Sequence, residues 1–230
     1  MQSDYQLAST SAVTAAPSTH KVLRNTYMLL GISMVPTVIG AVAGLSMNFS
    51  FAAQHPIMFA LGAFAAMMGL FWGINANRNS SLGVVLLLVL TGFMGLMLGP
   101  VLQVALHLRN GAQIVGLAAG GTGIIFMTLA SIATVSKKDF SFLGNFLMIG
   151  LVLLIVASFA NMFFQLPVMA LTISAISVLI FSGFILFDVS RIVQGGETNY
   201  VMATLAIYLD IYNLFLNLLQ LLMVLMGERD

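Results

Sequence analysis

Two acidic side chains of this sequence, Asp188 and Asp210, lie inside long apolar stretches. The remaining acidic residues lie in the terminal segments or in polar breaks: Asp4, Asp139, Glu197, Glu228 and Asp230. A carboxylate in the middle of a membrane helix costs about 2.5–3.5 kcal/mol on insertion scales. Such a group is kept because it pairs with another group, because it moves a proton or an ion, or both. We therefore expect the function to depend on these two carboxylates.

A pair of aspartates in a medium of low dielectric constant has a definite acid–base chemistry. The two carboxyl groups cannot easily both ionise, so they titrate as one coupled unit. A shared proton would hold their helices together, and its loss would make the helices repel, which predicts a pH-sensing gate. The ionised pair, Asp188 and Asp210, with Asn213 and water would also form a weak Ca²⁺ site. Because Ca²⁺ prefers six to eight oxygen ligands, such a site suits passage better than storage, and we expect no tightly bound cofactor.

The last apolar stretch carries a row of polar side chains in addition to its aspartate. Asp210, Asn213, Asn217 and Gln220 are spaced three, four and three residues apart, so they share one face of a helix. Lipid would leave that face unsatisfied, which predicts that the last helix is buried among its neighbours. In the simpler interpretation, Asn217 and Gln220 only hydrogen-bond to adjacent helices.

Two arginines are candidates for a latch on Asp188. Arg78 follows the second apolar stretch, and Arg191 lies about one helical turn beyond Asp188. The alternative for both is ordinary anchoring of helix ends by basic residues at the membrane surface.

Composition places the chain in a membrane. Hydrophobic residues make up 60% of the 230 residues and charged residues 7%, whereas soluble domains carry about 25% charged residues. Apolar runs of about 20 residues recur, each long enough to cross about 30 Å of hydrocarbon. They lack the short alternating pattern of a membrane barrel, so the chain is predicted to be an all-α polytopic membrane protein. A net charge of +1 gives no reason to expect nucleic acid as a partner.

Seven spans are predicted, separated by short breaks that carry turn residues: Tyr27–Met47, Pro56–Ile74, Leu82–Leu106, Ala112–Thr134, Phe142–Phe163, Leu166–Val193 and Asn199–Met226. Residues 1–26 are predicted to form a disordered cytoplasmic tail, and residues 27–230 a single seven-helix domain in the lipid bilayer, with a monomer favoured. Pro36 and Pro100 lie inside spans and should bend them. Several glycine pairs at four-residue spacing predict close helix packing: Gly40/Gly44, Gly69/Gly73, Gly95/Gly99 and Gly116/Gly120.

Basic residues predict the orientation. With the N-terminus in the cytoplasm, six of the eight Lys and Arg residues fall on the cytoplasmic side: Lys21, Arg24, Arg78, Lys137, Lys138 and Arg191. The positive-inside rule therefore places the N-terminus inside and the C-terminus outside. Both aspartates then belong to the cytoplasmic half. Counted from the turn between the last two spans, their depths differ by roughly 9 Å at about 1.5 Å per residue, so their pairing is a hypothesis.

Four sequence blocks resemble the Bax inhibitor-1 family. Gly183–Asp188 is similar to its sixth-helix signature, and Tyr208–Asp210 followed by Asn213-Leu214-Phe215 to its last-helix signature. Two further blocks match in order: Leu90-Thr91-Gly92 with Leu98-Gly99-Pro100, and Asn161–Phe164. The resemblance implies six helices around a central seventh. It also implies a pH-sensitive Ca²⁺ leak governed by an aspartate pair, here Asp188 and Asp210, with Arg78 as a candidate for the family's latch.

Bacterial members of this family lie in the inner membrane and are associated with the membrane AAA protease FtsH, as modulators and as substrates pulled by a cytoplasmic N-terminal tail. The resemblance therefore implies FtsH as a partner, and a modulator without transport function is the alternative to the leak. One departure concerns Val189-Ser190, where many relatives have Thr-Gln after the aspartate. Polar support for Asp188 is accordingly expected to differ.

An enzyme is not predicted. Intramembrane aspartyl proteases also place one aspartate on each of two adjacent helices, but their second aspartate follows Gly-x-Gly. Here bulky residues, Ile207-Tyr208-Leu209, precede Asp210, and no metalloprotease or serine-hydrolase motif is present. A secondary transporter is a weaker alternative because no pair of broken helices is evident.

Overall fold

A computed structural model describes residues 19–136 and 138–227. In this part of the chain all regular structure is helical, and seven helical spans are long and apolar enough to cross a membrane. The helices are α1 (Thr19–Ser46), α2 (Ser50–Gln54), α3 (Pro56–Ala76), α4 (Ser81–Met97), α5 (Gly99–Leu106), α6 (Gly111–Ser136), α7 (Leu143–Phe164), α8 (Pro167–Val193) and α9 (Tyr200–Met226). The predicted seven-span, all-α architecture is confirmed.

The boundaries agree with the prediction to within two residues except at three places. The first span begins at Thr19 instead of Tyr27, so residues 19–26 of the predicted tail are helical, and residues 1–18 lie outside the described residues. The third span is divided into α4 and α5 at Leu98, beside Pro100, where a bend was predicted. The short helix α2 was not predicted. Pro36 does not interrupt α1.

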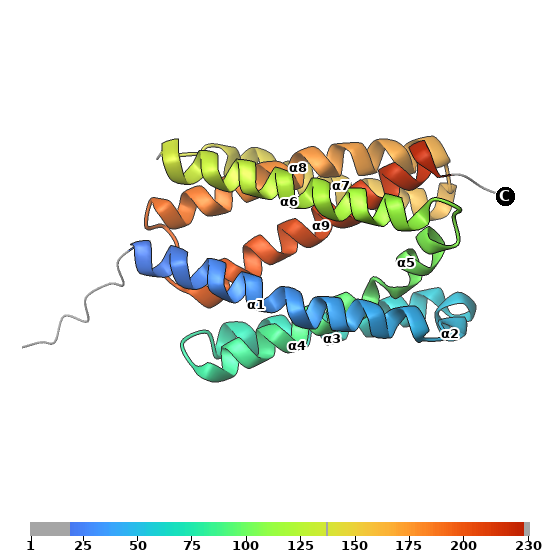
Figure 1. Cartoon of the computed structure of the whole chain (residues 1–230), viewed down its shortest axis with the longest axis horizontal. Coiled ribbons are helices and arrows are strands. Elements are labelled where there is room, and N and C mark those ends of the chain that lie inside the picture. The colour runs from blue at the N-terminus through green and yellow to red at the C-terminus, as the bar shows by residue number, and fades with distance from the viewer. Residues whose placement is uncertain (1–18, 137, 228–230) are drawn as a thin grey trace, which may run out of the picture.

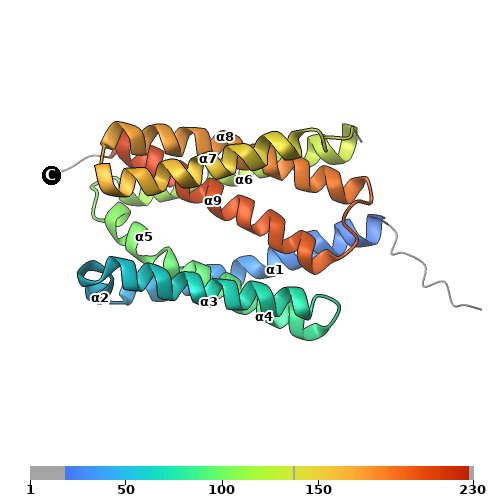
Figure 2. The same cartoon turned by 180° about the vertical axis from the view of Figure 1, so that it is seen from behind.

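Two layers of helices enclose a crossing helix. In Figures 1 and 2, α1, α3 and α4 form one layer and α6, α7 and α8 the other, while α9 runs obliquely between them. Helix α9 packs against α1, α3, α4, α6 and α8, and α7 packs on the outer side of α8. The last helix is therefore central, as its polar row predicted.

Glycines bring the backbones of α1 and α4 into contact. A Cβ added to Gly40 would overlap the carbonyl oxygen of Gly92, and one added to Gly95 would overlap that of Thr37. At Gly44 the added atom would lie 2.6 Å from the carbonyl oxygen of Leu96. The four-residue spacing of small residues thus marks a real interface here.

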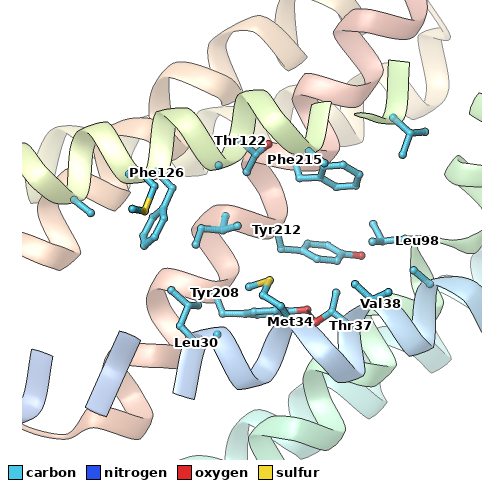
Figure 3. A pocket seen from close by; sticks show the side chains of 18 of the residues that line it. Leu30, Met34, Thr37, Val38, Leu98, Thr122, Phe126, Tyr208, Tyr212 and Phe215 are labelled. Atoms are coloured by element: carbon cyan, nitrogen blue, oxygen red, sulfur yellow. Dashed lines mark hydrogen bonds between the residues drawn. The ribbon is translucent and has the colours of Figure 1, made fainter. Parts of the chain in front are cut away.

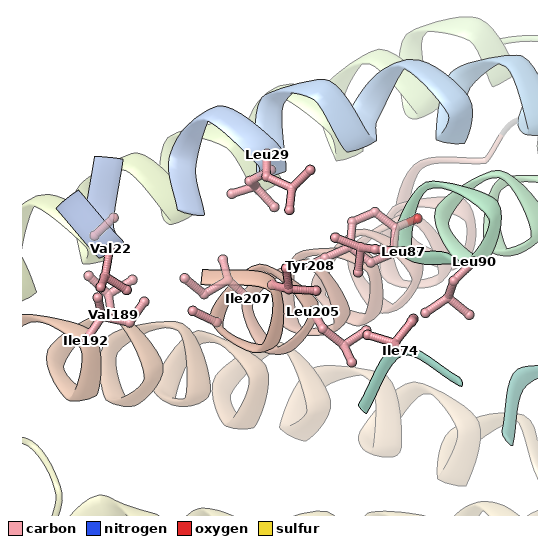
Figure 4. Packing of buried hydrophobic residues seen from close by; sticks show 14 of the residues in the cluster. Val22, Leu29, Ile74, Leu87, Leu90, Val189, Ile192, Leu205, Ile207 and Tyr208 are labelled. Carbon is pink, nitrogen blue, oxygen red and sulfur yellow. The ribbon is translucent and has the colours of Figure 1, made fainter. Parts of the chain in front are cut away.

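Buried apolar side chains around the first half of α9 form the larger core cluster (Figure 4). Ile207 and Tyr208 of α9 pack there with Leu29 of α1, Leu87 of α4 and Val189 of α8. A second cluster surrounds the other end of α9, where Leu219 meets α5 and α6. Large apolar side chains on the outer faces are exposed, for example Trp72 of α3, as expected of surfaces that contact lipid.

We expect Gly95→Ala to destabilise the protein, because its new methyl group must push α1 away from α4. Overpacking of this kind costs about 1–3 kcal/mol. Gly69→Ala is the matched control, since an added Cβ there meets nothing within 4 Å. Thermal unfolding of the purified proteins in detergent would show a lower midpoint for Gly95→Ala alone; equal midpoints would contradict the proposed role of this contact.

Candidate functional site

The structure brings the two intramembrane aspartates together. Asp188 lies near the end of α8 and Asp210 in the second quarter of α9, and their carboxyl groups are within hydrogen-bonding reach of one another. The side chain of Asp210 is buried, with 6% of the residue exposed, and Asp188 is half-buried. The two groups predicted to matter therefore occupy one site inside the bundle.

The oblique course of α9 explains why a depth difference of roughly 9 Å, estimated from residue counts, does not separate the pair. That estimate treats both helices as parallel to the membrane normal, at about 1.5 Å per residue. Figure 1 shows α9 strongly inclined to α8, and such a helix gains less depth with each residue. Residues 194–199 form the short turn between the helices, in which Gly195 takes a positive φ of 78°.

Asn199 fixes the beginning of α9. Its Oδ1 accepts hydrogen bonds of 3.0 Å from the backbone N–H groups of Val201 and Met202, which is an N-cap. Its Nδ2 donates to the carbonyl oxygen of Arg78 at 2.9 Å and to Oδ1 of Asn79 at 2.8 Å. One side chain thus holds the start of α9 against the loop between α3 and α4.

One oxygen of Asp210 has no hydrogen-bond donor. Among the described residues no donor reaches its buried Oδ2. A buried acceptor without a donor costs about 1–3 kcal/mol. A proton shared with Asp188 would supply a hydrogen bond to the carboxyl group of Asp210, so the arrangement suits a carboxyl–carboxylate pair.

The candidate latch residues occupy other positions. Arg191 Nη2 lies 3.5 Å from Glu197 Oε2, the one salt bridge among the described residues, and both charges act electrostatically on Asp188. The side chain of Arg78 is exposed, and its backbone carbonyl contacts α9 through Asn199. Neither guanidinium forms a salt bridge with Asp188 in the described part of the chain. Their role as latches stays a prediction.

The polar row below Asp210 is bonded mostly within α9. The side-chain amides of Asn213 and Asn217 are half-buried and donate at 2.8 Å to the carbonyl oxygens of Leu209 and Asn213. Gln220 is exposed, and its Oε1 accepts a 3.0 Å bond from Ser174 of α8. The simpler interpretation, helix-to-helix hydrogen bonding, therefore fits Gln220. The side-chain oxygens of both asparagines are not used in these bonds.

Two tyrosines close to Asp210 in the sequence, Tyr208 and Tyr212, were not predicted to attach α9 to other helices. The hydroxyl of Tyr208 lies 2.9 Å from Thr37 Oγ1 and donates to the carbonyl oxygen of Thr91 at 3.3 Å. The hydroxyl of Tyr212 donates to the carbonyl oxygen of Met94 at 3.0 Å. Their four-residue spacing was visible in the sequence, but their partners on α1 and α4 were not.

The two residues that follow Asp188, Val189 and Ser190, take part in packing and in a contact with a loop. Val189 is fully buried, and the Ser190 hydroxyl accepts from the backbone N–H of Phe140 at 3.2 Å and donates to the carbonyl oxygen of Lys138 at 3.1 Å. Ser190 thus ties α8 to the loop between α6 and α7.

A metal cluster is not evident. Among the described residues, no group of three or more His, Cys, Asp or Glu side chains could hold a metal ion. The aspartate pair would be the protein's carboxylate contribution to any bound Ca²⁺, and the weak site stays a prediction.

Comparisons with known proteins agree with this architecture. The family described as "Inhibitor of apoptosis-promoting Bax1", the Bax inhibitor-1 family, matches residues 19–227. A protein of Vibrio cholerae named "Uncharacterized membrane protein" is 44% identical over 221 residues, 96% of each chain. In Escherichia coli K12, "Modulator of FtsH protease YccA" is 39% identical over 209 residues, 91% of this chain and 92% of its own. A relative from Escherichia coli O6:H1 with the same identity and coverage is named "Inner membrane protein YccA".

The seven spans, the four matching blocks and the carboxyl pair on the last two helices all lie within the matched region. None of these names gives the protein an enzymatic activity of its own. The chain is a multi-pass membrane protein that belongs to the Bax inhibitor-1 family.

Proposed function

We propose that the protein is a pH-sensitive cation leak in which the Asp188–Asp210 pair is the gate, with Ca²⁺ as the permeant ion. The observation that carries the proposal is the contact of two carboxyl groups at the α8–α9 interface, one of them buried with an oxygen that has no donor. Groups of this kind inside a membrane protein mark ion or proton pathways.

The pH response follows from the charge of the pair. With one proton shared, the carboxyl groups hydrogen-bond to each other and hold α8 against α9. When that proton is lost, two negative charges face each other in a medium of low dielectric constant and repel. The same ionised pair attracts a divalent cation. Rising pH therefore opens the α8–α9 interface and increases flux, and falling pH closes it.

Asp210→Asn separates the effect of the proton from that of the hydrogen bond. The amide of the new side chain can donate to Asp188 at any pH, so this variant needs no shared proton. We expect the wild-type unfolding midpoint to fall as the pH rises from about 5 to about 9, and the midpoint of the variant to stay nearly constant. Parallel curves for the two proteins would contradict the shared proton.

Asp139→Asn is the control for that experiment. Asp139 is exposed in the loop before α7, and hydrogen bonds from Ser141 hold the pKa of its carboxyl below the usual value of 3.8. A depressed pKa contributes stability that is present above the unfolded-state pKa and is lost as the pH falls through the folded-state pKa. Above about pH 5 the control should therefore show the same pH dependence as the wild type.

Flux in liposomes tests the gate itself. Full-length protein in vesicles that contain a Ca²⁺ indicator should let Ca²⁺ enter faster at higher pH. Asp188→Asn and Asp210→Asn should each flatten the pH dependence, because the remaining carboxylate no longer faces a second carboxylate across the α8–α9 interface. Asp139→Asn should respond as the wild type does. The proposal fails if Ca²⁺ entry is absent, or if both pair variants retain the wild-type pH response.

A second candidate function is modulation of the membrane protease FtsH without transport. The observation that favours it is the name of the E. coli relative, a modulator of FtsH protease. Under this proposal the protein lies in the bacterial inner membrane and presents its N-terminal segment to the protease in the cytoplasm. The carboxyl pair would then only hold α8 to α9.

The two functions predict opposite sensitivities. Deletion of residues 1–18 leaves α1 complete, because that helix begins at Thr19. If modulation is the function, this deletion should abolish the effect of the protein on degradation of a membrane substrate by FtsH in cells, whereas Asp188→Asn and Asp210→Asn should not. A deletion variant that still modulates degradation would contradict the role of the N-terminal segment.

A further inference from the structure

A long apolar groove lies between α1 and α6, with α9 as its floor. Its volume is about 930 Å³. Figure 3 shows Met34 and Val38 of α1 on one side, Phe126 of α6 on the other, and Tyr212 and Phe215 of α9 between them. This groove is separate from the Asp188–Asp210 pair, neither of which lines it.

The groove opens sideways toward the membrane. Two of the lining residues on its rims are well exposed, Val38 of α1 by 61% and Met127 of α6 by 64%. Both belong to helices long and apolar enough to cross a membrane. The medium outside the opening is therefore hydrocarbon, and the groove is filled from the lipid phase or stays empty.

The polar groups in the walls leave little for water to bind. The hydroxyl of Tyr208 bonds to the hydroxyl of Thr37 on α1 and to a backbone carbonyl of α4, and the hydroxyl of Tyr212 bonds to another carbonyl of α4. The hydroxyls of Thr122 and Thr134 donate at 2.7 Å to carbonyl oxygens of their own helix. Apolar cavities without polar partners stay dry and take apolar ligands.

The length of the groove suits a hydrocarbon chain. Lining residues on α1 extend from Tyr27 to Leu45, which is about 27 Å at 1.5 Å per residue and close to the thickness of the hydrocarbon layer. An extended acyl chain is narrow enough to enter.

Basic residues lie at one end of the groove. The ring of Tyr27 makes an edge contact with Phe126, with centroids 6.2 Å apart, and its hydroxyl bonds to Thr134, so α1 and α6 meet there. Arg24 is three residues before Tyr27 and Lys138 four residues after Thr134, and both are exposed. Neither takes part in the one salt bridge among the described residues. This is the end that the distribution of Lys and Arg places in the cytoplasm.

We propose that this groove is a binding site for one anionic phospholipid of the cytoplasmic leaflet. An acyl chain lies between α1 and α6 over the aromatic residues of α9, and Arg24 and Lys138 bind the phosphate of the headgroup. Attraction between basic side chains and anionic lipid at the membrane surface contributes about 1 kcal/mol for each residue. The proposal does not depend on the leak or on protease modulation.

Native mass spectrometry of the delipidated full-length protein tests this site. The probes are dioleoyl phosphatidylglycerol, which is anionic, and dioleoyl phosphatidylcholine, which has the same chains and no net charge. We expect one phosphatidylglycerol to bind at concentrations at which phosphatidylcholine does not.

Glycines supply matched variants. Gly123 lines the groove, whereas Gly120 of the same helix does not, and an added Cβ meets nothing within 4 Å at either position. Gly123→Leu should fill the groove and lower phosphatidylglycerol affinity at least about tenfold, or about 1.4 kcal/mol. Gly120→Leu should bind as the wild type does. Equal affinities for Gly123→Leu and the wild type, or equal losses in both variants, would overturn the site.

A second variant leaves the groove unchanged. Arg24→Gln with Lys138→Gln alters exposed side chains only, so lost binding cannot be attributed to misfolding of the bundle. Phosphatidylglycerol affinity should fall to that of phosphatidylcholine; a preference that survives would overturn the headgroup contact. If Gly123→Leu binds phosphatidylglycerol normally but loses a protein that co-purifies with the wild type, the groove belongs to that protein and the lipid proposal is wrong.

Discussion

The burial of α9 is the constraint on which the rest of the structure depends. The face of α9 that carries Asp210, Asn213 and Asn217 cannot lie against lipid, because the hydrocarbon layer offers these groups no hydrogen-bonding partner. The two layers formed by α1, α3, α4 and by α6, α7, α8 supply the enclosure. Inside this enclosure the carboxyl group of Asp210 meets another carboxyl group, that of Asp188.

The inclination of α9 has two consequences at once. At its first half it brings Asp210 beside Asp188, which a helix parallel to α8 would place at a different depth. Along its length it also keeps α1 and α6 apart, since an inclined helix between two layers prevents them from closing evenly. The pair and the lateral groove are therefore products of the same crossing geometry (Figures 1 and 3). The α1–α4 contact does not open in this way, because Gly40 and Gly95 bring those two backbones together.

Much of this architecture follows from the sequence, for identifiable reasons. Long apolar runs and the turn residues between them define the spans, and the cost of an acid in lipid singles out Asp188 and Asp210. The start of α1 was missed because residues 19–26 are polar enough to resemble a tail, yet Val22 and Thr26 are buried against the bundle. Spacing alone could not give the inclination of α9, since it depends on packing between helices far apart in the chain. The groove was unpredictable for the same reason.

The bonding of α9 shows which of its interfaces depends on the pair. Tyr208 and Tyr212 attach α9 to α1 and α4, and the hydroxyl of Thr204 donates at 3.3 Å to the carbonyl oxygen of Thr26 on α1. Toward α8, the side-chain hydrogen bonds among the described residues are the carboxyl pair and, near the other end, the bond from Ser174 to Gln220, and the rest of this extensive interface is apolar packing that includes Val189 and Ile207. The bonds to α1 and α4 do not involve a carboxyl group. On the proposed mechanism, ionisation of the pair therefore weakens the α8–α9 interface and leaves the attachment of α9 to the α1–α4 layer unchanged.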